Sequence, residues 1–310
     1  MVNVRTVQDR GWRSIYTGVG TLPYWGVHLG AALGVIALGP SWRGLGWALG
    51  LYVVRMFFVT AGYHRYFSHR SYKTSRTFQC ILAALAAANG QRGPIWWAVI
   101  HRRHHRFSDQ PGDPHSPVTL PWYKAYYTWL IDEDTLATPL DEAKDLSRYP
   151  ELVWINKHHY VFPLATLAAT YLVGEYTTLF GATGLGLAAV VWVFFVSMVA
   201  SQHAPYMVNV FAHGTRPGPF NLRRFQTGDT STNMWWWTLP SMGAAFHNNH
   251  HRYMNAARAG FYWYEPDPTY WVLRMLALLG IVWDLKEVPA EVLEEGRRGI
   301  TDLRGSIKAE

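Results

Sequence analysis

Four apolar stretches, each close to the length that crosses a lipid bilayer, constrain the fold of this chain more than any other feature. They cover residues 22–39, 44–62, 160–174 and 181–201, and a helix needs about 20 apolar residues to span the hydrocarbon core. Arg55 and Pro163 interrupt the second and third stretches. The alternative is a large soluble protein with four buried helices. We expect an all-α integral membrane protein in which four transmembrane helices lie under a cytoplasmic helical cap.

The basic residues are distributed unevenly around these stretches. Of the 28 Lys and Arg residues, 26 fall on one side, and only Arg43 and Arg55 do not. The positive-inside rule then places the amino terminus, with Arg5, Arg10 and Arg13, in the cytoplasm together with the middle segment and the carboxyl third. We expect a multi-pass protein of the bacterial inner membrane whose active site faces the cytoplasm. The net charge of +7 then reflects this topology and contact with membrane lipid, and we expect no nucleic acid partner.

The segments between and after the apolar stretches are long and polar. Residues 63–159 and 202–288 are too polar to span a membrane and too long for simple loops, so we expect them to form the cap. Residues 289–310 form a charged tail, and residues 1–310 form a single membrane domain. One cysteine, Cys80, excludes an internal disulfide.

Histidine carries the chemistry of this sequence. Eight of the 14 histidines form three clusters, which are His64 and His69; His101, His104 and His105; and His247, His250 and His251. Helical positions i, i+3 and i+4 share one face, so each triplet presents its imidazoles to one side. Positions five apart do not share a helical face, so the helix must end or loosen between His64 and His69. We expect His28, His158, His159 and His203 to be ordinary structural residues.

Eight converging imidazoles favour a pair of metal ions. Burying so many titratable rings without a metal would cost desolvation and repulsion, and neutral imidazole binds iron, zinc and copper. A structural zinc takes four ligands and usually uses cysteine. The sequence contains no Glu-x-x-His, which excludes the carboxylate-bridged di-iron site of ferritin-like bundles. We predict a His-rich di-metal centre at the cytoplasmic face. The alternative from another class is a zinc-dependent membrane lipid hydrolase or a structural metal-holding protein.

The histidine clusters lie in segments that resemble a known family. These are TAGYHRYFSHRSYK (60–73), GPIWWAVIHRRHHRFSDQPGDPHS (93–116), NVFAH (209–213) and FHNNHH (246–251). From about residue 60 to residue 288 the chain resembles the membrane fatty acid desaturases of the stearoyl-CoA and acyl-lipid delta-9 type. The resemblance implies a mushroom shape, with a bent hydrophobic tunnel running past two irons.

The resemblance also implies a ligand set for each iron. The first would be held by His64, His69, His101, His105 and His251. The second would be held by His104, His213, His247 and His250, with Asn209 reaching it through a water. The spacing itself assigns no histidine to either metal. Asp113, in an Asp-Pro-His turn, could orient a ligand imidazole or cap a helix. Zinc can occupy such an iron site in purified protein.

The resemblance places the acyl chain beside the irons and against the second span. Trp97 matches a tryptophan that lines the substrate pocket of the family. The second span would close the tunnel, with Tyr52 as a candidate floor, and Arg55 lies within the same span. We expect Arg55 to pair with a polar group rather than to contact substrate. The sequence departs from the family at Gly243–Ala245, at Trp122–Trp129 and just before the second cluster. The acyl carrier therefore stays open between CoA, an acyl carrier protein and a membrane lipid.

The implied reaction is an oxygen-dependent desaturation that introduces a cis double bond, at the delta-9 position, into a saturated acyl chain. Hydroxylation or acetylene formation by the same centre is the alternative. The chain has no GxGxxG, CxxC or haem-binding motif, so we expect a separate electron donor of the ferredoxin or cytochrome b5 type with its reductase. Arginines near the clusters could form a basic collar for this donor, or contact phosphate groups. They are Arg102, Arg103, Arg106, Arg223, Arg224, Arg252 and Arg258.

Overall fold

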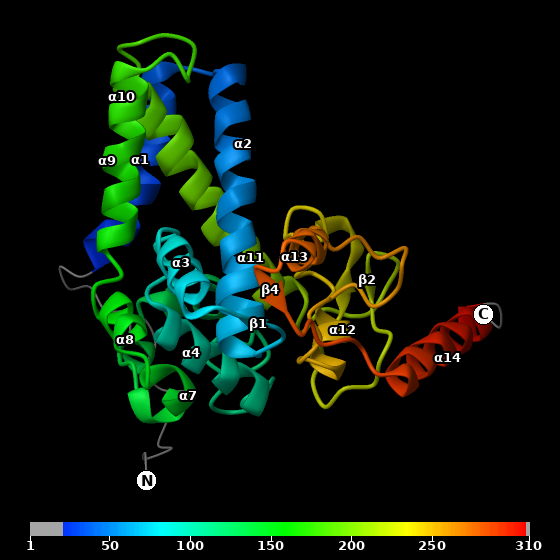
Figure 1. The fold of residues 1–310 in the computed structure, drawn as a ribbon. Helices are drawn as coiled ribbons and strands as arrows, with labels where there is room; N and C mark the ends of the chain where they lie inside the picture. The colour runs from blue at the N-terminus through cyan, green and yellow to red at the C-terminus, as the bar shows by residue number, and fades with distance from the viewer. Residues whose placement is uncertain (1–20, 308–310) are drawn as a thin grey trace.

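A bundle of long helices stands on a broader helical base (Figure 1). The structure is a computed structural model that describes residues 21–307, so Arg5, Arg10 and Arg13 lie outside the described residues. The bundle contains α1 (Leu22–Leu38), α2 (Trp42–Phe57), η3 (Phe58–Ser68), α9 (Val161–Tyr176), α10 (Gly186–Ala189), η6 (Val190–Val196) and α11 (Ser197–Phe211). The prediction of a mostly helical protein is confirmed.

Two of the bundle helices are long and apolar enough to cross a membrane, judged within residues 21–307. One is the continuous helix Trp42–Ser68, made of α2 and η3, and the other is Gly186–Phe211, made of α10, η6 and α11. At the first and third expected spans the structure has α1 and α9, with 17 and 16 residues. These are shorter than the roughly 20 residues of a full crossing. Four helices therefore occupy the expected places, and two of them meet the length criterion.

Glycine lets these helices approach closely. A Cβ atom on Gly34 of α1 would lie 2.5 Å from Val191, and one on Gly44 of α2 would lie 2.5 Å from Trp192. Both partners belong to η6, so the fourth helix packs into grooves that glycine leaves open on the first two. Small residues at helix contacts are typical of packing in membranes, where burial of apolar surface does not drive association.

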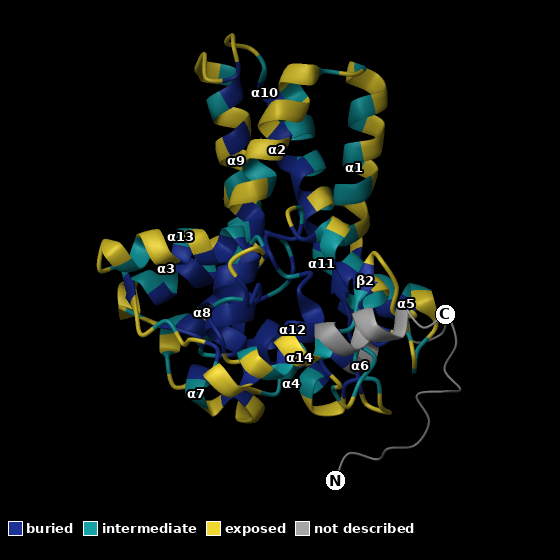
Figure 2. Ribbon diagram, turned by 90° about the vertical axis from the view of Figure 1, so that its right-hand side faces the viewer, coloured by how far each residue is buried: buried dark blue, intermediate teal, exposed yellow. Residues whose placement is uncertain are grey.

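Many residues of the bundle helices are exposed on its outer surface (Figure 2), and several of them are large and apolar. Ile36 is 78% exposed, Trp42 is 90% exposed and Leu187 is 72% exposed. Contiguous exposed apolar surface is unusual for a protein surrounded by water and marks contact with a partner or a membrane.

The base consists of short helices and two small antiparallel sheets. The helices are α3 (Arg76–Ala87), α4 (Pro94–Phe107), α5 (Trp122–Tyr126), η4 (Thr128–Leu130), α6 (Glu133–Leu136), η5 (Leu140–Ala143), α7 (Lys144–Ser147), α8 (Pro150–Lys157), η7 (Trp235–Trp237), α12 (His247–Arg252), α13 (Pro268–Leu278) and α14 (Ala290–Ile307). Strand β1 (Lys73–Thr74) pairs with β4 (Val282–Trp283), and β2 (Asn221–Leu222) pairs with β3 (Asn233–Met234).

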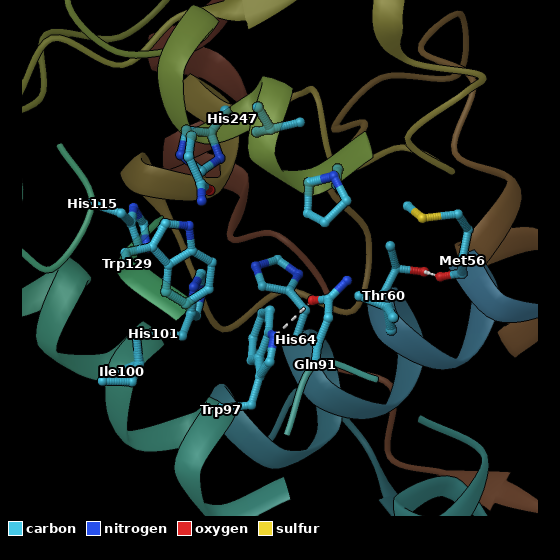
Figure 3. A pocket seen from close by; sticks show the side chains of 15 residues that line it. Met56, Thr60, His64, Gln91, Trp97, Ile100, His101, His115, Trp129 and His247 are labelled. Carbon is cyan, nitrogen blue, oxygen red and sulfur yellow. Dashed lines mark hydrogen bonds between the residues drawn. The ribbon is translucent and has the colours of Figure 1, made fainter. Parts of the chain in front are cut away.

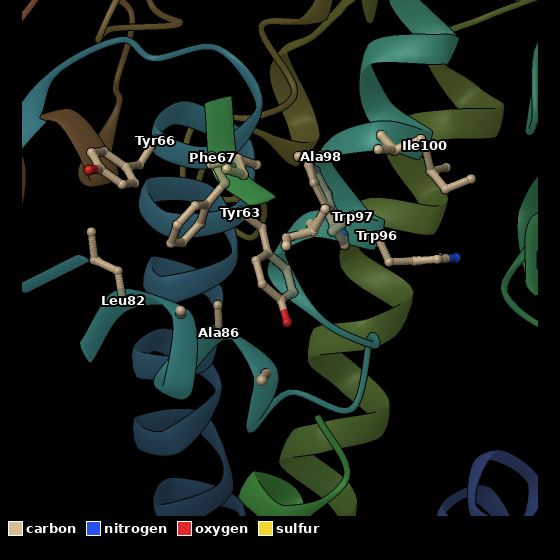
Figure 4. Close-up of a cluster of buried hydrophobic side chains, with 14 of the residues drawn as sticks. Tyr63, Tyr66, Phe67, Leu82, Ala86, Trp96, Trp97, Ala98 and Ile100 are labelled. Atoms are coloured by element: carbon tan, nitrogen blue, oxygen red, sulfur yellow. The ribbon is translucent and has the colours of Figure 1, made fainter. Parts of the chain in front are cut away.

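The main core of the base lies where η3, α3 and α4 meet (Figure 4). Its fully buried side chains include Tyr63, Phe67 and Leu82, and Trp96 packs into it from α4. A buried ion pair, Arg65 Nη2 to Asp267 Oδ1 at 2.8 Å, ties η3 to the residue that caps α13. The carboxyl end of the helix Trp42–Ser68 is thus anchored inside the base, and this anchor fixes the position of the histidines at that end.

Candidate metal centre

The first histidine cluster sits on an unusual helix. Residues Phe58–Ser68 form a π-helix, and His69 follows as its terminal residue. A π-helix bonds i to i+5 and is found mostly at functional sites, so its wider turn brings residues five apart closer to one face. The sequence predicted that the helix must end or loosen between His64 and His69. The structure shows the loosening, and it begins six residues before His64.

Five histidines bring their Nε2 atoms together in a first group, which contains His64, His69, His101, His105 and His250. The Nε2–Nε2 distance is 2.8 Å between His69 and His101 and 3.1 Å between His101 and His105. It is 2.9 Å between His105 and His250 and 3.0 Å between His250 and His64. The ligands come from η3 and its terminal residue, from α4 and from α12.

Four histidines form a second group, which contains His104, His213, His247 and His251. The Nε2–Nε2 distance is 2.9 Å between His213 and His247, 3.0 Å between His247 and His251, and 3.3 Å between His251 and His104. Here α4 and α12 contribute again, and His213 follows the end of α11.

Carboxylates hold the opposite ring nitrogens of the second group. The Nδ1 atom of His104 lies 2.9 Å from Asp113 Oδ2, that of His213 lies 3.1 Å from Asp109 Oδ2, and that of His251 lies 2.6 Å from Asp229 Oδ2. A carboxylate accepts the Nδ1 proton, so each Nε2 atom presents a bare lone pair to its neighbours. Within residues 21–307, no carboxylate bonds a ring nitrogen of the first group.

The nitrogen spacing fits metal ions. At an Nε2–metal distance of about 2.1 Å, ligands at right angles are about 3.0 Å apart, whereas tetrahedral ligands are about 3.4 Å apart. The first group, at 2.8–3.1 Å, matches the right-angled arrangement and has five donors. Facing lone pairs at this distance repel unless a cation lies between them. The residues present therefore fit a metal ion in each group, and imidazole donors suit iron, zinc and copper.

Burial favours the neutral, metal-binding form of five of these imidazoles. It lowers the pKa values of His69, His101, His105, His247 and His250 well below the usual value, and the charge of neighbouring imidazoles lowers them further. Among the carboxylates, burial alone would raise the pKa of Asp113, but the charge and hydrogen bond of His104 lower it to about 2.

A narrow apolar pocket of about 50 Å³ reaches both histidine groups (Figure 3). It touches His64 and His101 of the first group and His247 of the second. The other lining residues are Met56, Val59, Thr60, Gln91, Trp97, Ile100, His115, Trp129, Pro205, Val208, Asn209 and Ala244. The pocket thus extends from the two histidine groups toward Met56 on the helix Trp42–Ser68.

Comparison with known proteins identifies the family to which this arrangement belongs. A family model for fatty acid desaturases matches residues 40–277. The chain belongs to the fatty acid desaturase family. It is 31% identical over 270 residues to an sn-1 stearoyl-lipid 9-desaturase of Anabaena variabilis, which covers 86% of this chain and 93% of that one. It is 33% identical over 254 residues to an acyl-CoA 5-desaturase of Anemone leveillei (81% and 74%). It is 32% identical over 261 residues to a hex-5-enoyl-[acyl-carrier protein] acetylenase of Moorena producens (strain JHB), covering 81% and 79%.

The structure groups two histidines differently from the ligand sets that the resemblance implied. The resemblance assigned His251 to the first iron and His250 to the second, and the structure groups them the other way. The reason is helical geometry, because i and i+4 share a face and adjacent residues point about 100° apart. His247 and His251 therefore belong together, as His101 and His105 do in the first group.

The expected tunnel residues lie at different distances from the pocket. Trp97 lines it, stacks on His101 with ring centroids 4.9 Å apart, and donates to Gln91 at 3.3 Å. Asn209 also lines it, on α11 one turn before His213. Tyr52 is not a lining residue. It packs one turn beyond Met56, and its hydroxyl donates to the Pro240 carbonyl at 2.5 Å.

Arg55 points away from the pocket. Its guanidinium donates to Ser197 Oγ at 3.1 Å and to the Ala88 carbonyl at 2.6 Å, and its side chain is 3% exposed. This is the structural pairing with polar groups that the sequence interpretation preferred to substrate contact.

Sequence reasoning missed two carboxylates, Asp109 and Asp229. Asp109 also accepts hydrogen bonds from the Thr230 backbone and hydroxyl, at 2.7 and 2.6 Å. It therefore joins the second histidine cluster to a loop more than 100 residues later. No spacing rule predicts this contact. Asp113 was proposed as an orienting residue, and its bond to His104 supports that role.

The arginines of the expected basic collar are mostly engaged within the chain. Six of the seven make hydrogen bonds to carboxylates or backbone carbonyls: Arg102 to Asp145, Arg103 to Glu142, Arg252 to Glu295, Arg224 to Glu265, Arg223 to Thr227 and Arg258 to Tyr262. Within the described residues, Arg106 is the one that is exposed and makes none of these bonds. The arginines thus brace the base around the histidines.

Proposed function

We propose that the chain is a membrane-bound, oxygen-dependent fatty acyl desaturase that uses two iron ions and introduces a cis double bond at the delta-9 position. The observation that carries this proposal is a narrow apolar pocket touching both histidine groups. A narrow apolar slot suits a segment of an extended acyl chain, and the middle of the chain would lie beside the metals. The stearoyl-lipid 9-desaturase of Anabaena variabilis supports the delta-9 position.

The residues of the chain position the acyl chain and exclude water from the slot. The two metal ions, when bound by the nine histidines, activate O2 for removal of hydrogen from unactivated methylenes. Trp97 and Trp129 form aromatic walls, and Val59, Ile100 and Val208 keep the slot apolar. Holding one carbon pair beside the centre lowers the entropic part of the barrier. Excluding water from the slot would limit side reactions of the activated oxygen species with solvent. Asn209 faces the same slot, where a water could link it to the second group.

The reaction requires outside electrons. Removing two hydrogens from adjacent methylenes consumes one O2, two protons and two electrons, and yields the alkene and two waters. The sequence has no motif for a nucleotide, haem or dithiol carrier. A separate donor of the ferredoxin or cytochrome b5 type, with its reductase, therefore completes the system.

The membrane placement rests on the bundle. Helices Trp42–Ser68 and Gly186–Phe211 span the bilayer, and we infer that α1 and α9 complete a four-helix membrane domain despite their shorter length. A locally thinned bilayer accommodates short spans at modest cost. The base then faces the cytoplasm of the bacterial inner membrane, on the side that holds nearly all Lys and Arg residues.

The test is product analysis in cells. The chain is expressed in a host without desaturase, and the fatty acids are profiled by gas chromatography with mass spectrometry. We expect monounsaturated chains with the double bond at carbon 9. His104→Ala and His213→Ala should abolish the product, whereas His28→Ala and His158→Ala should retain it. Activity that survives His213→Ala, or a position other than carbon 9, contradicts the proposal as stated.

A second candidate is acetylene formation, which the relative from Moorena producens favours because it is an acetylenase. The same centre would then act on an existing alkene. Feeding the expressing cells a monounsaturated and a saturated acid in parallel distinguishes the two, since only the acetylenase converts the alkene to an alkyne.

A further inference from the structure

A second cavity lies behind the wall of the metal pocket. It has a volume of about 320 Å³, well above the roughly 30 Å³ that one water occupies. Arg92, Gly93, Trp96, Thr138, Leu140, Val153, Asn156, Lys157 and His159 line it. Three of these side chains can carry positive charge. None of the described lining residues carries a carboxylate.

The two cavities share one partition. Gln91 and Trp97 line the metal pocket, and their chain neighbours Arg92 and Trp96 line the second cavity. Trp96 also stacks on Trp129 of the metal pocket, with ring centroids 5.8 Å apart and an interplanar angle of 7°. Two stacked rings, Trp96 and Trp129, would therefore separate a ligand in the second cavity from the acyl slot.

No ion pair joins the positive groups to a carboxylate among the described side chains. Arg92 has a left-handed backbone, with φ of 63°, and donates to the carbonyls of Leu130 and Leu136 at 3.1 and 3.4 Å. Its guanidinium lies 5.1 Å from the centre of the Trp96 ring. Lys157 is exposed at the end of α8 and makes no ion pair with any described residue. Burial, and then the charge of Arg92, lowers the pKa of His159 to about 4. His159 can therefore donate a neutral ring N–H to an anion, while Arg92 and Lys157 supply the positive charge.

The cavity also lies at the level where lipid headgroups are expected. Lys157 ends α8, and α9 begins four residues later at Val161. The flanking Trp154 and Tyr160 are 53% and 51% exposed, as is typical of aromatic residues at a membrane surface.

We propose that this cavity binds the phosphate group of the acyl carrier, with Arg92, Lys157 and His159 as its contacts. The inference rests on the proposed desaturase function for the identity of the carrier, but binding of phosphate can be measured without turnover. Phosphate accepts charge-assisted hydrogen bonds from such groups. It could belong to a soluble thioester carrier or to the headgroup of a membrane lipid, and the experiment separates these sources.

The first arm measures binding. The zinc-loaded protein, in nanodiscs of uncharged galactolipid, is titrated with glycerol 3-phosphate, and the phosphorus-31 line width reports binding. We expect Lys157→Ala and His159→Ala each to weaken binding about fivefold or more. Lys144→Ala, which removes an exposed lysine on α7, should bind as the parent does. Arg92 is left intact because its carbonyl contacts support the fold. Absence of binding by the parent, or equal binding by all variants, overturns the proposal.

The second arm identifies the source of the phosphate. Desaturation is followed with stearoyl-CoA, with stearoyl phosphatidylglycerol and with a stearoyl galactolipid that has no phosphate. For the true carrier we expect Lys157→Ala to raise KM about fivefold while kcat changes less than about twofold. The galactolipid serves as the insensitive control. Sensitivity to stearoyl-CoA alone indicates a soluble carrier, and sensitivity to phosphatidylglycerol alone indicates a lipid. An unchanged KM for both overturns the carrier role.

The two proposals fail in distinguishable ways. Phosphate binding that depends on Lys157, in a chain that desaturates none of the three substrates, leaves the site standing and removes the proposed function. Desaturation that is insensitive to Lys157 and His159 does the reverse.

Discussion

Asp113→Asn should lower the occupancy of one of the two proposed metal sites and leave the other filled. Both carboxylate oxygens of Asp113 lie within 3.0 Å of His104 Nδ1, and they also accept the backbone N–H groups of Asp109 and His115. Asparagine keeps the shape but loses the negative charge and one acceptor. The His104 imidazole then becomes a weaker donor to metal. The first histidine group has no carboxylate contact within the described residues, so its affinity should change little.

The expected magnitude follows from this asymmetry. Loss of a carboxylate that supports a metal-ligating histidine typically costs about 10-fold to 100-fold in affinity, which is about 1.4–2.7 kcal/mol. If free metal is buffered tenfold above the dissociation constant of the second site, the parent fills that site to about 90%. The variant should fill it to between about 50% and 10%.

The assay is metal content per chain after equilibrium dialysis against a metal buffer, read by mass spectrometry. Asp145→Asn is the matched control, because Asp145 binds Arg102 and Arg70 and contacts no ligand. An unfolding temperature of Asp113→Asn close to that of the parent verifies that this variant retains the fold. If Asp113→Asn loses both metals together, or keeps both, the carboxylate does not act on the second group alone and the reasoning is wrong.

Three further predictions concern other parts of the chain. Met56→Ala should lengthen the preferred acyl chain by about two to four carbons, because one helical turn of about 6 Å separates Met56 from Tyr52. Adding Tyr52→Ala should lengthen the preferred chain further. Lipid profiling measures the chain length for both variants. Asp267→Asn should lower stability by about 3–5 kcal/mol, since it leaves the buried Arg65 guanidinium without its counter-charge; thermal unfolding measures the loss. Although burial raises the pKa of Asp145, its arginine partners lower it to about 2, so its stabilising effect is complete above about pH 4 and disappears as the pH falls toward 2. The difference in unfolding temperature between parent and Asp145→Asn should close over that window.

The sequence predicted that the histidines converge, because helical spacing places them on shared faces. The spacing of the triplets on α4 and α12 is enough to put three imidazoles on one face of each helix. The i, i+4 rule alone would also have sorted His101 with His105 and His247 with His251. The split carried over from the resemblance overrode this local signal for His250 and His251.

Other features depend on contacts that no local pattern encodes. Asp109 and Asp229 reach their histidines through loops, over 104 and 22 residues of sequence. The fourth expected span was placed at residues 181–201, whereas the helix runs from Gly186 to Phe211. The sequence interpretation ended it where polar residues begin, but His203 is bonded to His28 and Tyr126 inside the protein. Tertiary hydrogen bonds thus let polar residues extend an apolar helix.

The metal centre joins elements that have little stability of their own. Helix α12 has six residues, too few to be stable alone, yet it supplies ligands to both groups. Its Asn248 and Asn249 side chains bond to Arg224, Phe225 and Asn233 around it, so a polar shell holds the helix from behind. On the opposite side of α12, bound metal would connect its histidines to those of α4 and of the π-helix η3. Because facing lone pairs repel in the metal-free state, metal binding and the closing of the base against the bundle are thermodynamically linked.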